Sequence, residues 1–341
     1  MTVAKIDPPE NADEVYDVSF RPEQSLFQQS ARRLFRNKAA VVGGIFILIL
    51  VLMSVFAPVI TSYDFAEQDL LANNAVPAWM LFLLPEGAEN YANISDKFVL
   101  GADSLGRDTW TRTIYGARIS LQFAFAAAAI SLVVGTAYGA IAGYLGGWAD
   151  DIMMRFVDFL YGFPFLIMVI LMQSYFKALA LRGSGGPFVQ ALIKANDNMG
   201  GLLFMFIAIG LINWLTLARV ARGQVLSYKK KEFVEAAHSM GASDMRIILR
   251  HILPNIMGPL IVLETLAIPG YIFLEAFLSF IGLGVNPPTP SWGIMIAEAT
   301  QSLRVYPNQI LIPAIFLSVT TLAFNFLGDG LRDAFDPKMK N

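Results

Sequence analysis

Residues 39–60 read AAVVGGIFILILVLMSVFAPVI, an unbroken apolar run without a charged side chain. At about 1.5 Å of rise per residue, such a run crosses the roughly 30 Å hydrocarbon core of a bilayer as one helix. Five further apolar segments follow it along the chain. We therefore predict an all-α polytopic membrane protein. Its six transmembrane helices are expected at residues 39–60, 119–144, 156–176, 201–217, 258–280 and 309–327.

The composition supports this class. Of 341 residues, 55% are hydrophobic and 15% are charged, whereas soluble domains carry about 25% charged residues. The alternating segments of roughly ten residues that are typical of outer-membrane barrels are absent. A net charge of −2 with no broad basic surface gives no reason to expect a nucleic-acid partner, and zero cysteines exclude disulfides and thiolate chemistry.

The N-terminal part divides into two segments. Residues 1–24 have little to bury and predict a disordered cytoplasmic tail. In residues 25–38, apolar side chains recur at helical spacing among arginines. This pattern predicts an amphipathic helix at the membrane interface, with an ordinary solvated helix as the alternative. The apolar run after it is long and lacks a cleavage signal, so we interpret it as a retained anchor.

Lysine and arginine indicate the orientation. With both termini on one side of the membrane, that side carries 17 basic residues and the other side carries eight. The positive-inside rule therefore places both termini in the cytoplasm. Residues 61–117 become an extracytoplasmic loop, and residues 118–330 form a five-helix core that includes a cytoplasmic loop at 219–257. Residues 331–341 form a cytoplasmic tail.

The cytoplasmic loop has clear helix signals. Residues 229–240 predict one helix, and Gly241 is the usual residue where a chain leaves a helix in a left-handed conformation. Ser243 is a candidate cap for a second helix, which Pro254 would end or kink. Such a helix–turn–helix bracket suits the transmission of force to a partner. A loop that packs only on its own membrane spans is the alternative.

The loop sequence also resembles a known family. The pattern E-A-A-x-x-x-G-A, followed by H-x-L-P-N, is similar to the cytoplasmic EAA loop of permease subunits from binding-protein-dependent ABC importers. In that family the loop docks into a groove of the nucleotide-binding subunit. The resemblance implies a set of residues that couple the chain to an ATPase: Glu235, Ala236, Ala237, Gly241, Ala242, Leu253, Pro254 and Asn255.

Other segments resemble one branch of the family. The segments GADSLGRD, YGARISL, LSFIGLG, SWG and GLRDAFDP look like those of the C-type permease of dipeptide and oligopeptide importers. Residues 64–96 depart from this pattern because they make the first external loop longer than usual. The resemblance implies a permease subunit in a bacterial or archaeal plasma membrane. Its implied partners are a second homologous permease, two ABC ATPases and an extracytoplasmic peptide-binding protein.

The chain lacks the motifs of an enzyme. No G-x-x-x-x-G-K-[ST] loop and no H-E-x-x-H motif occur, and the two histidines, His238 and His251, do not suffice for a three-histidine zinc site. We therefore expect no catalytic site, cofactor or metal in this chain. ATP and magnesium would be bound by the partner ATPase subunits.

Two groups of charged residues remain. Glu264 and Glu275 lie 11 residues apart in the fifth predicted span, which Pro269 and Gly270 are expected to interrupt. A charge at mid-bilayer costs roughly 2.5–3.5 kcal/mol on insertion scales, so each glutamate is expected to face a peptide path or a neighbouring helix. The second group is external and forms either a structural cluster or a dock for the binding protein: Asp103, Arg107, Asp108 and Arg118.

Two alternative functions stay open. Within the family, closely similar permeases carry nickel chelates, opines or oligosaccharides. Outside the family, a secondary transporter or channel would need no ATPase. Such a protein would be expected to show inverted repeats or an ion-coordinating site within the membrane.

Overall fold

The computed structural model describes residues 26–182, 186–210 and 212–335. In this part of the chain no strand occurs, and six helical segments are long and apolar enough to cross a membrane. The predicted helical class with six spans is therefore confirmed. The segments are Lys38–Val55, Thr109–Leu145, Phe165–Arg182, Leu202–Tyr228, Asp244–Phe280 and Asn308–Phe335. The tail predicted at residues 1–24 lies outside the described residues.

The N-terminal helices pack against the C-terminal helix. The basic helix predicted over residues 25–38 is shorter than expected, because α1 ends at Leu34 after beginning at Leu26. The side chain of Asn37 accepts a hydrogen bond from the Ala40 N–H, and this cap begins α2 (Lys38–Val55). The short helix α3 (Ala57–Ile60) follows. Both α1 and α2 lie along α14 (Asn308–Phe335).

The segment between the first two spans, which we call the external segment after its predicted side of the membrane, is folded. It contains three short 3-10 helices, η1 (Leu70–Ala72), η2 (Ala78–Leu83) and η3 (Ala88–Asn90). A small core of Ala72, Ala75, Phe98 and Ala102 holds it together. The segment ends at residue 108 instead of the predicted 117, because the Asp108 carboxylate accepts hydrogen bonds from the N–H groups of Trp110 and Thr111 and so begins α4 (Thr109–Leu145).

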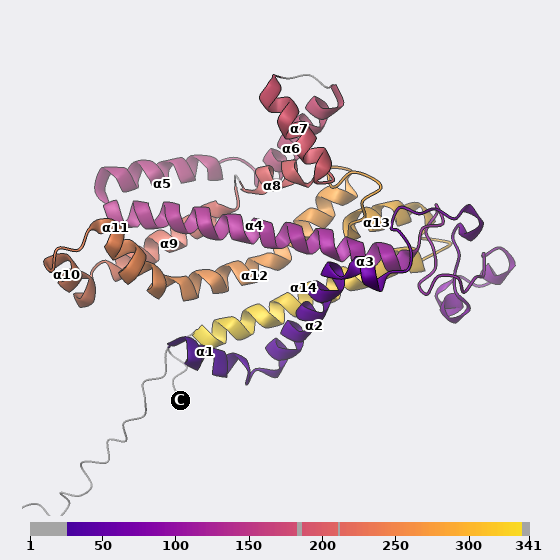
Figure 1. The fold of residues 1–341 in the computed structure, drawn as a ribbon, viewed down its shortest axis with the longest axis horizontal. Helices are drawn as coiled ribbons and strands as arrows, with labels where there is room; N and C mark the ends of the chain where they lie inside the picture. Colours follow the sequence, from indigo (N-terminus) through magenta and orange to yellow (C-terminus); the bar gives the residue numbers. More distant parts are fainter. Residues whose placement is uncertain (1–25, 183–185, 211, 336–341) are drawn as a thin grey trace, which may run out of the picture.

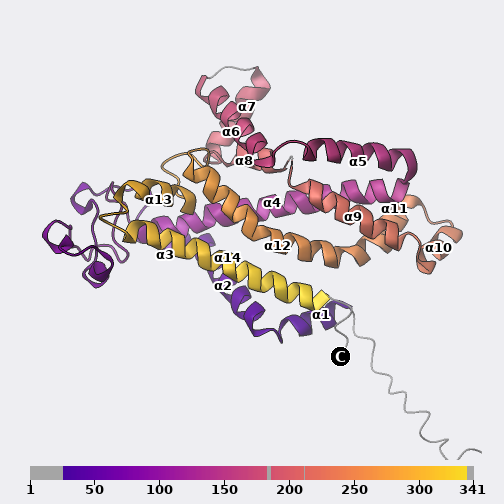
Figure 2. The same ribbon diagram turned by 180° about the vertical axis from the view of Figure 1, so that it is seen from behind.

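Four helices form the central bundle. Helix α4 lies beside α9 (Trp214–Tyr228) and α12 (Leu253–Phe280), and α12 also contacts α14 (Figures 1 and 2). The external segment lies at one end of the bundle. At the other end are α10 (Glu232–Ser239) and α11 (Asp244–Ile247) (Figure 1). The bundle therefore separates the two candidate functional regions by its full length.

Glycines bring α4 and α9 into close contact. Gly135, Gly139 and Gly143 recur every four residues along α4. A Cβ on Gly139 would lie 2.2 Å from the carbonyl oxygen of Ala218, and one on Gly143 would lie 2.9 Å from that of Arg222. Small residues at this spacing let two transmembrane helices approach through their backbones. The stripe therefore joins α4 and α9 into one unit.

The third and fourth predicted spans have different bounds in the structure. The span expected at 156–176 is divided, because α5 (Gly147–Tyr161) ends before Pro164 and α6 (Phe165–Arg182) begins after it. Proline disfavours the helical conformation of the residue before it, which accounts for the break. Helices α6 and α7 (Pro187–Asn198) project from the bundle (Figure 1). The fourth span comprises α8 (Leu202–Gly210) and α9 and extends beyond residue 217.

The predicted interruption of the fifth span is wrong. Pro259 and Pro269 both lie inside α12, which runs unbroken from Leu253 to Phe280. Transmembrane helices tolerate proline because neighbouring helices and local adjustments satisfy the freed backbone groups. Pro254 also does not end a helix. It follows a π-helical turn at Ile248–Ile252, so the helical hydrogen bonding changes register beside the residue that has no N–H.

Candidate functional site

The helix–turn–helix bracket predicted from the sequence forms in the structure. Helix α9 ends at Tyr228, and α10 begins at Glu232, so the helix predicted at residues 229–240 starts three residues later than expected. After α10 the chain passes through Gly241, whose φ of +81° lies in the left-handed region. Helix α11 then leads through the π-helical turn directly into α12. We call residues 229–252 the bracket.

The bracket is attached firmly to the ends of the bundle. Val234, Ala237 and Ile247 are buried together with residues of α4 and α9. The hydroxyl of Tyr144, at the end of α4, donates a hydrogen bond of 2.7 Å to Asp244 Oδ1. Lys229 Nζ donates to the carbonyl oxygen of Tyr144. These contacts suit a rigid projection, because movement of the bracket must carry α4, α9 and α12 with it.

The predicted coupling residues differ in exposure. Glu235, Ala236 and Gly241 are exposed on the bracket, and Pro254 and Asn255 are exposed just after it. Ala237 is buried, so it packs inside the bracket and does not offer a contact surface. Ala242 and Leu253 are half-buried and pack against the same internal cluster. The sequence pattern therefore combines surface residues with residues that hold the bracket in shape.

Sequence reasoning missed four exposed apolar residues on the bracket. Phe233, Met240, Met245 and Leu249 are between 42% and 82% exposed. Separately, a cavity of about 280 Å³ lies between the bracket and the end of α4, lined partly by Tyr144, Glu235 and His238. Exposed apolar patches on a polar segment mark surfaces for other proteins, and methionine adapts readily to a partner's shape. The sequence signal that could have identified these four residues is their apolar character within a basic loop.

The two glutamates of the fifth span form matching contacts with α4. The Ser131 hydroxyl donates to Glu264 Oε1, and the Ser120 hydroxyl donates to Glu275 Oε2, each over 2.6 Å. Both serines and both glutamates are 11 residues apart, as expected for two antiparallel helices in register. Glu264 is 6% exposed and Glu275 is fully buried. These contacts support the hypothesis that the glutamates join neighbouring helices.

Each glutamate also has a second partner within α12. The Tyr271 hydroxyl donates to Glu264 Oε2 over 3.0 Å. The Ser279 hydroxyl donates to Glu275 Oε1 over 2.6 Å. Both oxygens of each carboxyl group are therefore hydrogen-bonded, as buried polar groups require. The two serines on α4, Ser120 and Ser131, were not predicted, although their spacing repeats that of the glutamates.

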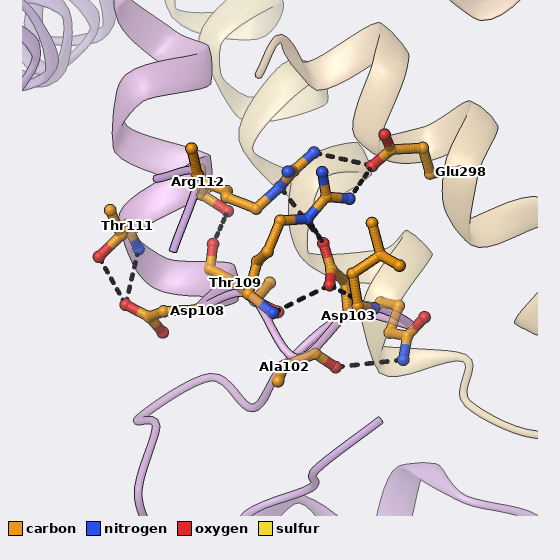
Figure 3. A network of polar contacts seen from close by, with 12 residues as sticks. Ala102, Asp103, Asp108, Thr109, Thr111, Arg112 and Glu298 are labelled. Atoms are coloured by element: carbon orange, nitrogen blue, oxygen red, sulfur yellow. Dashed lines mark hydrogen bonds and ion pairs between the residues drawn. The ribbon is translucent and has the colours of Figure 1, made fainter. Parts of the chain in front are cut away.

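The external charged residues divide into two sets. Arg112 donates to Glu298 Oε2 over 2.7 Å (Figure 3). Arg107 donates to the same oxygen over 2.7 Å and to Asp103 over 2.6 Å. This network joins the external segment and α4 to α13 (Trp292–Ala299). Arg107 and Arg112 are 4% and 1% exposed, so their charges are directed inward. Glu298 was not predicted, although it is the sole acidic residue between positions 281 and 307.

The other predicted external residues lie apart from this network. Asp108 is buried and caps α4, with Thr111 as its hydrogen-bond donor (Figure 3). Arg118 lies nearly three turns further along α4 and lines a separate cavity. Of the four residues proposed as a dock, Asp103 and Arg118 are half-buried. The cluster predicted from the sequence is therefore largely an internal structural network.

The described residues hold no metal-like cluster. Within 26–182, 186–210 and 212–335, no group of three or more histidine, aspartate or glutamate side chains could hold a metal ion.

Comparison with known proteins agrees with the fold and the bracket. Residues 135–341 match the family described as binding-protein-dependent transport system inner membrane component. Residues 25–77 match the N-terminal transmembrane domain of oligopeptide transport permease C. The first match covers the bracket and both glutamates of α12. The second covers α1, α2 and the start of the external segment.

Three relatives illustrate the likeness over nearly the whole chain. An oligopeptide transport system permease protein OppC of Haemophilus influenzae is 41% identical over 334 residues, which cover 96% of each chain. A dipeptide transport system permease protein DppC of Bacillus subtilis is 40% identical, over 94% of this chain and 88% of its own. A glutathione transport system permease protein GsiD of Pectobacterium atrosepticum is 36% identical, over 91% and 90%. This chain therefore belongs to the family of binding-protein-dependent transport system inner membrane components, and it is a multi-pass integral membrane protein of the bacterial inner membrane.

Proposed function

We propose that this chain is a permease subunit of an ATP-driven importer and that its cargo is peptides. The single observation that carries the proposal is the bracket, which is fixed to three helices of the bundle and offers exposed apolar residues to a partner. The names of the relatives, which include oligopeptide, dipeptide and glutathione transport, favour peptides as the cargo.

We infer that the chain works in a complex with four other components. A second permease would complete the translocation path, and two ATPase subunits would bind ATP and magnesium and dock on the bracket. An extracytoplasmic binding protein would deliver the peptide to the opposite end. The chain itself would be non-catalytic. The excess of lysine and arginine supports an orientation with both termini and the bracket in the cytoplasm.

The geometry of the bracket supports a route for force. Helix α11, the π-helical turn and α12 form one helical segment from Asp244 to Phe280. At about 1.5 Å per residue, this segment of 37 residues spans roughly 55 Å and reaches the outer half of the bundle. Closure of the ATPases would therefore tilt α12 together with α4 and α9. Such a tilt would open the path alternately to each side.

The coupling role is tested with a bulky residue on the bracket surface. Ala236→Trp places an indole on the exposed face of α10, where it should obstruct docking while leaving the buried side of the helix intact. We expect the variant to enter the membrane, to co-purify with less ATPase subunit, and to lose coupled uptake. Ala191→Trp, at an exposed position of α7, is the matched control. Normal coupled uptake by Ala236→Trp would contradict the docking role.

A further inference from the structure

A cavity of about 540 Å³ lies in the half of the bundle near the external segment. One wall is formed by α4, with Tyr115, Arg118 and Gln122, and the facing wall by the start of α8, with Leu202 and Phe206. The volume falls within the roughly 300–1,000 Å³ that is usual for small-molecule sites. The cavity is therefore large enough to hold part of a transported molecule.

The α4 wall of the cavity carries a polar stripe beside the apolar Ile119 and Ala126. Tyr115, Arg118 and Gln122 are spaced by three and four residues, so their side chains emerge on the same face of the helix. The rest of the lining is mainly apolar and includes Met199, together with the polar Asn198 and Thr289. One wall therefore offers hydrogen-bond donors, and the other offers a surface that accepts side chains of many kinds.

Arg118 is the sole charged side chain among the residues that line the cavity. It lies in a membrane-spanning helix, nine residues after the start of α4 at Thr109. In the described part of the chain, no acidic side chain lies within ion-pair distance of it. By contrast, Arg107 and Arg112 both have acidic partners. Arg118 directly precedes the apolar stretch predicted to span the membrane at residues 119–144, and an ionisable residue so close to a span normally faces a partner or a water-filled path.

We propose that Arg118 binds the terminal carboxylate of a peptide as it passes through the cavity. This inference rests on the proposed function. A carboxylate terminus is common to linear peptides of any sequence, and the planar guanidinium of arginine can bind it with two parallel hydrogen bonds. The apolar wall would meanwhile receive the variable side chains. Arg118 would thus recognise the part of the cargo that does not vary.

Exposure of Arg118 suits transient binding. The side chain is half-buried and faces an open cavity, so water screens its interaction with a carboxylate. A path for transport requires binding that is favourable enough for arrival and weak enough for departure. A fully buried arginine such as Arg112 would hold an anion too tightly to release it.

The inference is tested with the complete complex reconstituted in proteoliposomes. Uptake is measured for one peptide with a free carboxylate and for the same peptide with a C-terminal amide. The binding protein is saturated with each peptide, and the ratio of the two uptake rates is compared between wild type and Arg118→Gln. Because the same binding protein is present throughout, its own preference cancels when the ratios are compared. Arg304→Gln, at an exposed external arginine outside the cavity, is the matched control.

We expect Arg118→Gln to lower uptake of the free peptide about tenfold or more, which corresponds to the loss of a charge-assisted hydrogen-bond pair, and to leave uptake of the amide unchanged. Arg118→Lys should retain part of the preference for the carboxylate, whereas Arg304→Gln should retain all of it. An equal fall for both peptides would overturn the inference and would assign Arg118 to the binding-protein dock or to packing. An unchanged ratio and rate would also overturn it. In both cases the wild-type complex still imports peptide, whereas failure of wild type with both peptides would refute the proposed function itself.

Discussion

The glycine stripe between α4 and α9 leads to a prediction about stability. In Gly139→Ala, the added methyl group would lie 2.2 Å from the Ala218 carbonyl oxygen and 2.8 Å from the Ala221 Cβ. The two helices would have to separate by about 1 Å to restore ordinary van der Waals contact, an overpacking that costs about 1–3 kcal/mol. Alanine also favours a helix over glycine by about 1 kcal/mol, which offsets part of this cost. The net destabilisation is therefore up to about 2 kcal/mol.

Gly223→Ala is the matched control for this prediction. Gly223 is also a helical glycine, in α9, but no atom lies within 4 Å of the position of an added Cβ. The same substitution should therefore be neutral or slightly stabilising there. Reversible unfolding in mixed micelles, followed by circular dichroism, measures both variants against wild type. If Gly139→Ala proves as stable as Gly223→Ala, the close contact between the two helices is not a source of stability.

Three further predictions concern polar groups. Glu275→Gln should retain most peptide uptake, because an amide can still bond the neighbouring hydroxyls; loss of uptake in an assembled complex would instead favour a charge in the path. Glu298→Gln should lower the midpoint of thermal unfolding, because two buried arginines lose a shared anion. The loss should be smaller than the roughly 3–5 kcal/mol of a fully buried pair, since Glu298 is 33% exposed and Asp103 still faces both arginines. An unchanged midpoint, as expected for the exposed control Glu86→Gln, would contradict this. The hydrogen bond between Lys97 and Asp69 lowers the pKa of Asp69 and raises the pKa of Lys97. The stabilisation from this pair is therefore fully present between about pH 4 and 10, the ordinary pKa values of the two groups. It is lost as the pH falls below this window, where Asp69 is protonated, or rises above it, where Lys97 is deprotonated. The protection of backbone amides in residues 61–108 against hydrogen exchange, corrected for the intrinsic rate, should stay constant across that window. A steady change of this protection within the window would refute the stabilising role of the Lys97–Asp69 pair.

The apolar runs and the loop motif made much of the architecture predictable. Hydrophobic length identifies a membrane helix regardless of its neighbours, so the existence of the spans followed from the sequence. Their ends did not, since they depend on local contacts such as the cap that Asp108 provides for α4. Proline illustrates the same limit. Pro164 lies at a break between helices, whereas Pro269 lies within one, because the packing around each residue decides the outcome.

Contacts between residues far apart in the chain were the least predictable part of the candidate site. The sequence indicated that Arg107 and Asp108 are charged and external, but it could not show that Glu298 would turn Arg107 inward. That contact joins residues 191 positions apart in the chain. Exposure was equally hidden within the EAA pattern, where Ala236 is exposed and its neighbour Ala237 is buried. Helical periodicity could have suggested this difference, because adjacent residues of a helix face directions about 100° apart.

The two serine–glutamate contacts restrict how α4 and α12 can move past one another. Because Ser120 meets Glu275 and Ser131 meets Glu264 at the same time, any sliding of one helix along the other breaks both contacts together. Each broken contact would leave a carboxyl group without one of its donors in an apolar interior. The two contacts therefore hold α4 and α12 in one fixed register. If the complex alternates between two shapes, the sliding surfaces must lie elsewhere, at the boundary of this helix pair with other parts of the assembly.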